Sequence, residues 1–206
     1  MSSKAMKNNR EETNLKTRQG QNMKRMPVHQ VHTVIQGENE VITPIVSFVG
    51  NSNSGKTTLL EKVVGELKLK GYRVVVIKHS PHGFDIDQPG KDTWRLAQAG
   101  SDIVVASSPD KVAFIERVDA ELTLSQIEAL LRGKADIVLT EGYKNSSTAK
   151  ILVLGDEQDR EQLCCQGEIL ATISVRLSPL GMSEFDYNDV ARIVNLLIEQ
   201  IALKNH

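Results

Sequence analysis

Residues 45–60 read IVSFVGNSNSGKTTLL, and this stretch decides the fold class. Its first five residues form a short, β-rich, uncharged run between a proline and a glycine, which is typical of a buried parallel strand. The leucines and valines that follow give residues 56–70 one apolar helical face, and Gly71 is a suitable end for that helix. The sequence therefore predicts a strand, a glycine-rich turn and a helix in direct succession.

The turn itself, residues 50–57, satisfies the pattern G-x-x-x-x-G-K-[ST] of a phosphate-binding loop. Gly50 permits the tight turn and Gly55 lets the backbone approach a phosphate, while backbone N–H groups at the helix start supply partial positive charge. Lys56 is expected to bridge the β- and γ-phosphates, and Thr57 to place its hydroxyl on Mg²⁺. The predicted nucleotide-binding residues are Gly50, Asn51, Ser52, Asn53, Ser54, Gly55, Lys56, Thr57 and Thr58.

Short apolar runs alternate with amphipathic ones through the rest of the chain. Further strands are predicted at 73–77, 102–106, 111–116 (with an antiparallel direction considered for this one), 137–140, 150–154 and 169–174. Further helices are predicted at 92–99, from Thr123 as N-cap to about 131, and from Asp186 as N-cap to about 203. The alternation predicts an α/β P-loop NTPase with a doubly wound, mostly parallel sheet and helices on both faces.

Composition separates a tail from this domain. Residues 1–26 hold seven basic and two acidic residues and few large apolar ones, so we expect 1–43 to be a flexible basic extension and 44–206 to be the nucleotide-binding domain. An added edge strand within 28–42 is the alternative for part of the extension. The net charge of −1 and the lack of a long apolar run favour a cytoplasmic protein without nucleic-acid or membrane partners. The adjacent Cys164 and Cys165 are expected to be reduced thiols.

A phosphate-bound Mg²⁺ needs carboxylates from nearby strand ends. Glu141 follows an apolar strand and precedes a glycine, and ligands of doubly wound sheets bind beyond the carboxyl ends of the strands. Asp85 and Asp87 follow the second strand at the same end, and Asp87 is the favoured one, with a simple turn role as the alternative. The predicted metal ligands are Thr57, Asp87 and Glu141, and the predicted catalytic residues are Lys56, Asp87 and Glu141.

Other polar residues near this end are less specific. His79 and His82 are either a metal pair or ordinary loop residues, because no third ligand is close in sequence. Lys91 and Arg95 are either substrate-phosphate ligands or solvated charges. Trp94 is expected to pack against the domain.

Several segments together resemble one family. They are 50–59, V-I-K-H at 76–79, H-G-F at 82–84, D-Q-P-G-K-D-T-W-R at 87–95, Q-A-G at 98–100 and E-G-Y-K at 141–144. In this combination the chain resembles the MobB family, the molybdopterin-guanine dinucleotide biosynthesis adaptor proteins, over about 44–155. The basic extension 1–43 is not part of the family pattern.

The resemblance implies functions that the residue spacing does not reveal. Members of the family bind GTP with Mg²⁺, hydrolyse it weakly and are dimeric, and molybdopterin is a further ligand to consider. They are thought to assist a guanylyltransferase, MobA, which joins GMP to molybdopterin. The family's phosphate-loop roles correspond to Gly55, Lys56 and Thr57, and its acidic positions to Asp87 and Glu141. Guanine specificity rests on the resemblance, because the sequence contains no N-K-x-D guanine-reading motif.

Two other function classes stay open at this point. A small-metabolite kinase would use Asp87 or Glu141 as a general base. A nickel-type metallochaperone GTPase would use a histidine or cysteine cluster, for which His79 and His82 are the available residues. For the GTP-binding adaptor, slow hydrolysis is expected, because the sequence shows no obvious arginine finger or water-positioning glutamine; Gln88 and Arg95 are the only candidates.

Overall fold

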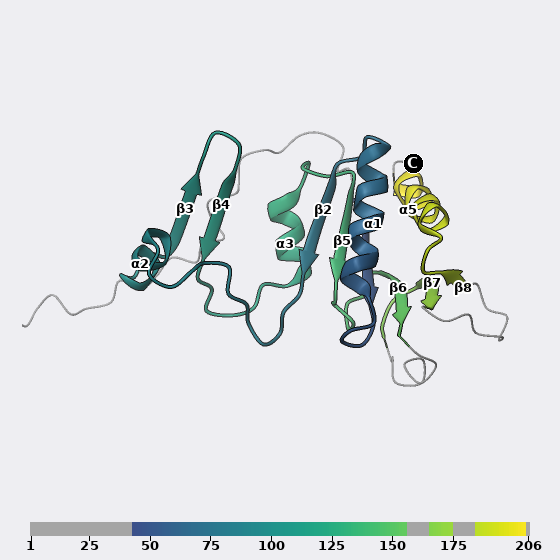
Figure 1. The fold of residues 1–206 in the computed structure, drawn as a ribbon, viewed down its shortest axis with the longest axis horizontal. Helices are drawn as coiled ribbons and strands as arrows, with labels where there is room; N and C mark the ends of the chain where they lie inside the picture. Colours follow the sequence, from purple (N-terminus) through teal and green to yellow (C-terminus); the bar gives the residue numbers. More distant parts are fainter. Residues whose placement is uncertain (1–42, 156–164, 175–183, 205–206) are drawn as a thin grey trace, which may run out of the picture. The chain divides into compact units, whose positions relative to one another are not determined.

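The computed structural model describes residues 43–155, 165–174 and 184–204 (Figure 1). The predicted basic extension, apart from Thr43, lies outside the described residues. The edge strand considered within 28–42 and Cys164 lie outside them as well.

In the part of the chain that the structure describes, the domain is built on a six-stranded sheet with the order β2-β5-β1-β6-β7-β8. The strands are β1 (Ile45–Val49), β2 (Val74–Lys78), β5 (Ile137–Glu141), β6 (Ala149–Leu154), β7 (Ile169–Ser174) and β8 (Glu184–Asp186). Every neighbouring pair in this sheet is parallel, so the predicted fold class is confirmed. Parallel order places the carboxyl ends of β1, β2 and β5 at one edge, where the phosphate loop begins.

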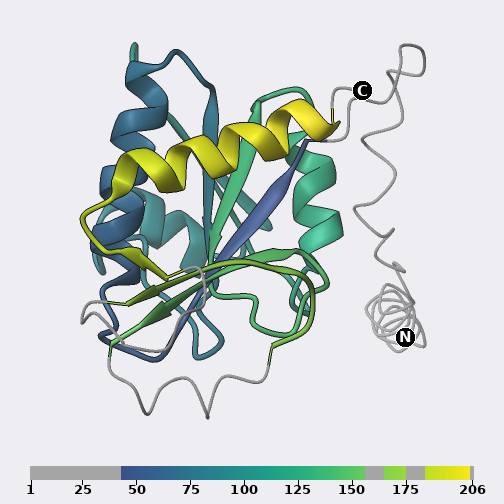
Figure 2. The same cartoon turned by 90° about the vertical axis from the view of Figure 1, so that its right-hand side faces the viewer.

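Helices lie on both sides of the sheet. The apolar stripe of α1 (Lys56–Leu69), made by Leu59, Val63 and Leu67, is fully buried and joins the core together with α5 (Val190–Lys204). Figure 2 shows α3 (Leu124–Leu131) on the side of the strands opposite to α1. Right-handed crossovers explain this, because the chain moves outward from β1 to β2 and then back to β5. None of the helices that the structure describes has the length and hydropathy needed to cross a membrane.

The two faces of the central strands differ in chemistry. On the face that meets α1, the alternate residues Val46, Phe48 and Leu139 are buried and apolar. On the other face, Ser47 and Thr140 are polar and completely buried. Successive strand residues point to opposite faces, so one strand can serve both an apolar core and a polar layer.

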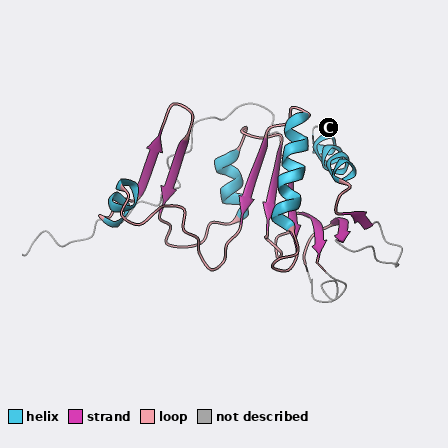
Figure 3. Cartoon of the chain, in the orientation of Figure 1, coloured by secondary structure: helices cyan, strands magenta, loops and turns pink. Residues whose placement is uncertain are grey.

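A separate two-stranded sheet lies between β2 and α3 in the sequence. It consists of β3 (Ile103–Ser107) and β4 (Val112–Glu116), which are antiparallel, and it follows α2 (Asp92–Gln98) (Figure 3). The antiparallel direction considered for the second of these strands is therefore confirmed. Neither strand joins the main sheet, which the alternating pattern had not indicated. A short connection allows only antiparallel pairing, because a parallel neighbour requires a long crossover.

The two predicted helix caps have different outcomes. Thr123 caps the start of α3, as predicted, and the structure shows that it does so in a capping box with Gln126. The prediction that Asp186 caps the last helix is wrong, because Asp186 ends β8 and its carboxylate accepts from the backbone N–H of Asn188 at 2.7 Å. Asp189 stands directly before α5 and accepts from the backbone N–H of Arg192. Asp186 therefore closes a turn of the kind that aspartate side chains favour.

Candidate functional site

The phosphate loop connects β1 to α1 at the carboxyl edge of the sheet. A Cβ atom on Gly50 would lie 2.2 Å from the carbonyl oxygen of Val153 in β6, so no other residue fits there without a shift of the backbone. Asn53 and Gly55 have φ angles of 64° and 84°, in the left-handed region. Alternation of such residues with right-handed ones turns successive N–H groups toward one concavity, which suits an anion.

Polar contacts hold the start of α1 in place. Lys56 Nζ donates to the carbonyl oxygen of Asn51 at 2.6 Å and to Ser54 Oγ at 3.4 Å, so its cation folds back over the loop. The hydroxyl of Tyr187, from the segment before α5, donates to the carbonyl oxygen of Gly55 at 3.0 Å. The Lys56 ammonium thus lies beside the concavity in which a phosphate would bind.

Thr57 and Glu141 meet directly. Thr57 Oγ1 lies 3.0 Å from both carboxylate oxygens of Glu141, although the two residues are 84 positions apart in sequence. Glu141 ends β5 and pairs in register with Lys78, the last residue of β2. Lys78 Nζ lies 3.4 Å from Glu141 Oε2, and the Glu141 side chain is only 15% exposed. The carboxyl edge therefore carries a hydroxyl, a carboxylate and an ammonium group within contact distance.

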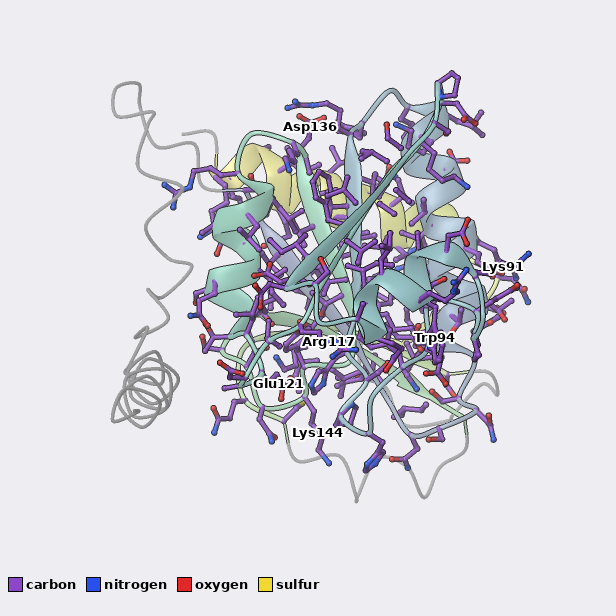
Figure 4. The ribbon with its side chains drawn as sticks, turned by 90° about the vertical axis from the view of Figure 1, so that its left-hand side faces the viewer. Lys91, Trp94, Arg117, Glu121, Asp136 and Lys144 are labelled. Atoms are coloured by element: carbon purple, nitrogen blue, oxygen red, sulfur yellow. The ribbon has the colours of Figure 1, made fainter. Side chains whose placement is uncertain are left out.

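A cavity of about 1200 Å³ opens above these groups. It is lined by phosphate-loop residues, by the end of β2, by residues 121–124 and by residues 141–146. In Figure 4, Glu121 and Lys144 lie near one end of the domain and Asp136 near the other. Asp136 pairs with Arg73 at 2.7 Å, and this contact holds the pKa of the Asp136 carboxyl below its usual value. The two residues directly precede β5 and β2, so the pair lies at the edge of the sheet away from the cavity.

His79 lies beside Glu141 in the cavity lining and contacts residues from two other segments of that lining. Its backbone N–H donates to the carbonyl oxygen of Glu141 at 3.0 Å, and its Nε2 lies 2.6 Å from Glu121 Oε1. Its ring stacks on Tyr143 with centroids 4.6 Å apart. A Cβ on Gly142 would lie 3.0 Å from His79 Cβ, so glycine allows this close approach. Burial, followed by the charge of Glu121, raises the pKa of the Tyr143 phenol.

A buried polar layer supports the loop after β5. Thr140 Oγ1 donates to Ser47 Oγ at 2.8 Å, and Ser47 Oγ lies 2.7 Å from Thr148 Oγ1. Lys150 is completely buried, and its Nζ contacts the carbonyl and hydroxyl oxygens of Ser146 and Thr148 at 2.8–3.2 Å. Burial lowers the pKa of Lys150. These contacts satisfy the buried polar groups and fix the path of residues 141–148.

Most of the predicted binding residues meet at the cavity. The predicted residues that contribute to its lining are Gly50, Ser52, Asn53, Gly55, Lys56, Thr57, Thr58 and Glu141. Asn51 and Ser54 do not line it; they contact the Lys56 ammonium from within the loop.

Asp87, the other predicted metal ligand, has different partners in the structure. Its Oδ1 accepts from Thr93 Oγ1 at 3.0 Å and from the backbone N–H of Gln88 at 2.9 Å. It does not line the cavity, and neither do Asp85, His82 or Gln88. The structure therefore brings Glu141, but not Asp87, to Thr57.

The remaining candidates lie away from the cavity lining. Lys91, Trp94 and Arg95 do not line it; Arg95 pairs with Asp92 at 3.6 Å and Trp94 is partly buried. Among the described residues, no group of three or more His, Cys, Asp or Glu side chains could hold a metal ion.

Several lining residues were missed by the sequence analysis as site residues. Glu121, Leu122 and Leu124 surround the predicted cap Thr123, and no local motif marks them as ligand-facing. Lys78 and Tyr143 were noticed only as parts of family-like segments. Their position next to a strand end was the available signal, because the ends of parallel strands form the ligand edge.

Comparison with known proteins identifies the family. The family model described as molybdopterin guanine dinucleotide synthesis protein B, MobB, matches residues 45–175. This chain belongs to the MobB family. The adapter protein of molybdopterin-guanine dinucleotide biosynthesis from Escherichia coli (strain K12) is 30% identical, with 81% of this chain and 98% of that protein covered. The protein of the same name from Haemophilus influenzae is 32% identical, with 81% and 93% covered.

Solved MobB structures have the same fold. A crystal structure of molybdopterin-guanine biosynthesis protein B matches with a TM-score of 0.64 and 32% identity, covering 77% of this chain and 99% of that one. Bacillus subtilis MobB matches with a TM-score of 0.64 and 29% identity, covering 76% and 97%. The resemblance carried by the sequence segments is thereby confirmed.

Proposed function

We propose that this chain is a GTP-binding adaptor in molybdopterin guanine dinucleotide biosynthesis, with weak Mg²⁺-dependent GTP hydrolysis. In this role it assists a MobA-like guanylyltransferase in the cytoplasm. Membership of the MobB family and the adapter names of the relatives support the biosynthetic role. The observation that best supports nucleotide binding is the contact of Thr57, at the end of the phosphate loop, with Glu141.

The residues at this contact fit Mg²⁺. The Thr57 hydroxyl, 3.0 Å from each Glu141 carboxylate oxygen, and that carboxylate are hard oxygen ligands that can share one small cation. Thr57 and Glu141 would hold the ion, which when bound neutralises charge on the phosphates. Lys56 would bind the phosphates from the loop side.

Slow hydrolysis agrees with the residues around the cavity. The cationic side chains among the described lining residues are Lys56, Lys78 and Lys144, with His79 as a further ring nitrogen donor. No arginine or glutamine is present in that lining, and these are the residue types that accelerate hydrolysis in related nucleotide sites. The cavity of about 1200 Å³ exceeds the roughly 300–1,000 Å³ usual for one ligand, so it has room for a second one, for which this proposal takes molybdopterin.

The adaptor role is tested by recovering the partner. The tagged full-length chain, loaded with Mg²⁺ and a non-hydrolysable GTP analogue or left without nucleotide, is expected to retain the molybdenum cofactor guanylyltransferase of its own source organism in a pull-down. Retention in at least one of the two states supports the adaptor role. If the enzyme is recovered in neither state at micromolar concentrations, the adaptor role is wrong.

A homodimer is part of the same proposal, and the hairpin β3–β4 provides a surface for it. Val104 on one face is buried, whereas Val105, Val112 and Phe114 on the other face are 52%, 56% and 70% exposed. An isolated two-stranded hairpin is marginally stable in water, and neighbouring apolar side chains exposed on one face favour coverage by another chain. We take a second copy of this chain as the occupant.

Phe114→Glu is therefore expected to shift the protein from dimer to monomer, because a carboxylate would have to be buried in the interface. Light scattering after size-exclusion chromatography measures the change at micromolar concentration. Leu69→Glu is the matched control, since Leu69 is 84% exposed at the end of α1 and outside the hairpin. An unchanged dimer mass for Phe114→Glu would exclude this surface, and a dimer lost in both variants would show that the effect is not specific.

A further inference from the structure

Lys78 is a cation of the cavity that the phosphate-loop motif does not include. It ends β2, lies beside Glu141 in register and lines the cavity. Its Nζ is 3.4 Å from Glu141 Oε2, while its side chain is 61% exposed. The ammonium group is therefore held at the Glu141 carboxylate but remains accessible from the cavity.

The neighbours of Lys78 show where a phosphate would meet it. Thr57 and Glu141 would hold the metal ion, which would supply positive charge to the phosphates of a nucleotide bound beside Glu141. Lys56, whose ammonium group lies over the loop at Asn51 and Ser54, would reach the phosphates from the loop side. Lys78 ends β2, the strand next to β5, and would meet a terminal phosphate from the side of the cavity opposite to the phosphate loop.

The charges change when nucleotide binds. In the structure Glu141 carries one negative charge and Lys78 is its cationic partner. With a divalent ion held at Glu141, this carboxylate would no longer need Lys78 as its cationic partner, and Lys78 could contact the negative charge of a terminal phosphate. A lysine has a flexible stem and three donors, so its Nζ can move by a few ångströms from one oxygen to another.

We propose that Lys78 binds the terminal phosphate of the nucleotide and gives the protein its preference for a triphosphate over a diphosphate. In the nucleotide-free protein the same ammonium group neutralises Glu141. This role of Lys78 rests on the proposed nucleotide-binding function, because it requires a nucleotide in the phosphate loop.

The test compares two charge-removing variants of the same cavity. Lys78→Gln is expected to weaken binding of a non-hydrolysable GTP analogue with Mg²⁺ by about 10- to 100-fold, the loss of one charge-assisted hydrogen bond. Binding of GDP with Mg²⁺ should change by less than about threefold, since that phosphate is absent. Lys144→Gln, a second lysine in the lining, should leave the ratio of the two dissociation constants unchanged. Calorimetric titration of the full chain measures both constants.

These titrations test the role of Lys78 separately from nucleotide binding by the chain. Equal loss for both nucleotides in Lys78→Gln, or no loss, would overturn the role of Lys78. Lys78→Arg keeps the charge and is expected to keep the preference, which distinguishes phosphate binding from a general effect on the fold. If the unmodified chain binds neither nucleotide, the proposed function itself fails. If it binds them through Lys56 and only the Lys78 prediction fails, the proposed function stands.

Discussion

Lys56→Ala is expected to weaken binding of GTP with Mg²⁺ by at least about 100-fold. The lysine would make charge-assisted contacts with both the β- and γ-phosphates, each contributing about 1.5–3 kcal/mol, and 1.4 kcal/mol corresponds to a tenfold change in affinity. In the structure the ammonium group lies over the loop, 2.6 Å from the Asn51 carbonyl oxygen, so it is placed for this role. Fluorescence titration with a labelled GTP analogue measures the change.

Lys70→Ala is the control for Lys56→Ala. Lys70 follows the far end of α1 and pairs with Glu66 at 3.7 Å on the exposed surface. Removing such a surface pair costs little stability and should leave nucleotide binding unchanged. If Lys56→Ala is folded, as judged by circular dichroism, and binds the analogue as tightly as the unmodified chain, the phosphate loop does not bind nucleotide in the manner proposed.

Glu141→Gln is expected to remove the Mg²⁺ dependence of nucleotide binding. The unmodified chain should bind the GTP analogue about 10- to 100-fold more tightly with Mg²⁺ than with a chelator, because the ion adds charge-assisted contacts. The glutamine amide keeps the shape of the side chain but loses the carboxylate charge. Titrations with Mg²⁺ and with chelator measure the difference for each variant.

Asp87→Asn is the informative comparison for Glu141→Gln. The Asp87 carboxylate accepts from Thr93 and from the Gln88 backbone and does not line the cavity, so this variant is expected to keep the Mg²⁺ dependence. The opposite pattern, with the dependence lost in Asp87→Asn and kept in Glu141→Gln, would make Asp87 the metal ligand. Such a result would require residues 80–91 to rearrange when the nucleotide binds.

Local sequence predicted the parts of the site that are built from consecutive residues. The phosphate loop connects a strand to a helix over 45–69, and its function depends on glycines, a lysine and a threonine within that one stretch. The capping box at Thr123 was likewise predictable, because its two partners are three residues apart. Asp186 was assigned wrongly as a cap, since a turn at 187–188 and an aspartate at 189 offered the same local signals.

Contacts between distant residues were not predictable in the same way. The contact of His79 with Glu121 joins residues 42 positions apart, and the layer of Ser47, Thr140 and Thr148 joins residues up to 101 positions apart. Lys150 lies in an apolar strand, and nothing in the sequence indicates that its ammonium group is satisfied by the loop before it. These contacts depend on the order of strands in the sheet, which the alternation of elements does not specify.

The sequence by itself determined the α/β fold class, the phosphate loop and the resemblance to the MobB family, because each depends on local spacing and residue type. Tertiary structure decided which acid joins Thr57. Glu141 and Asp87 were both predicted ligands that follow a strand, yet β5 lies between β1 and β2 and brings Glu141 to the loop and to Lys78. Strand order is set by the packing of the whole sheet, and short-range patterns cannot encode it.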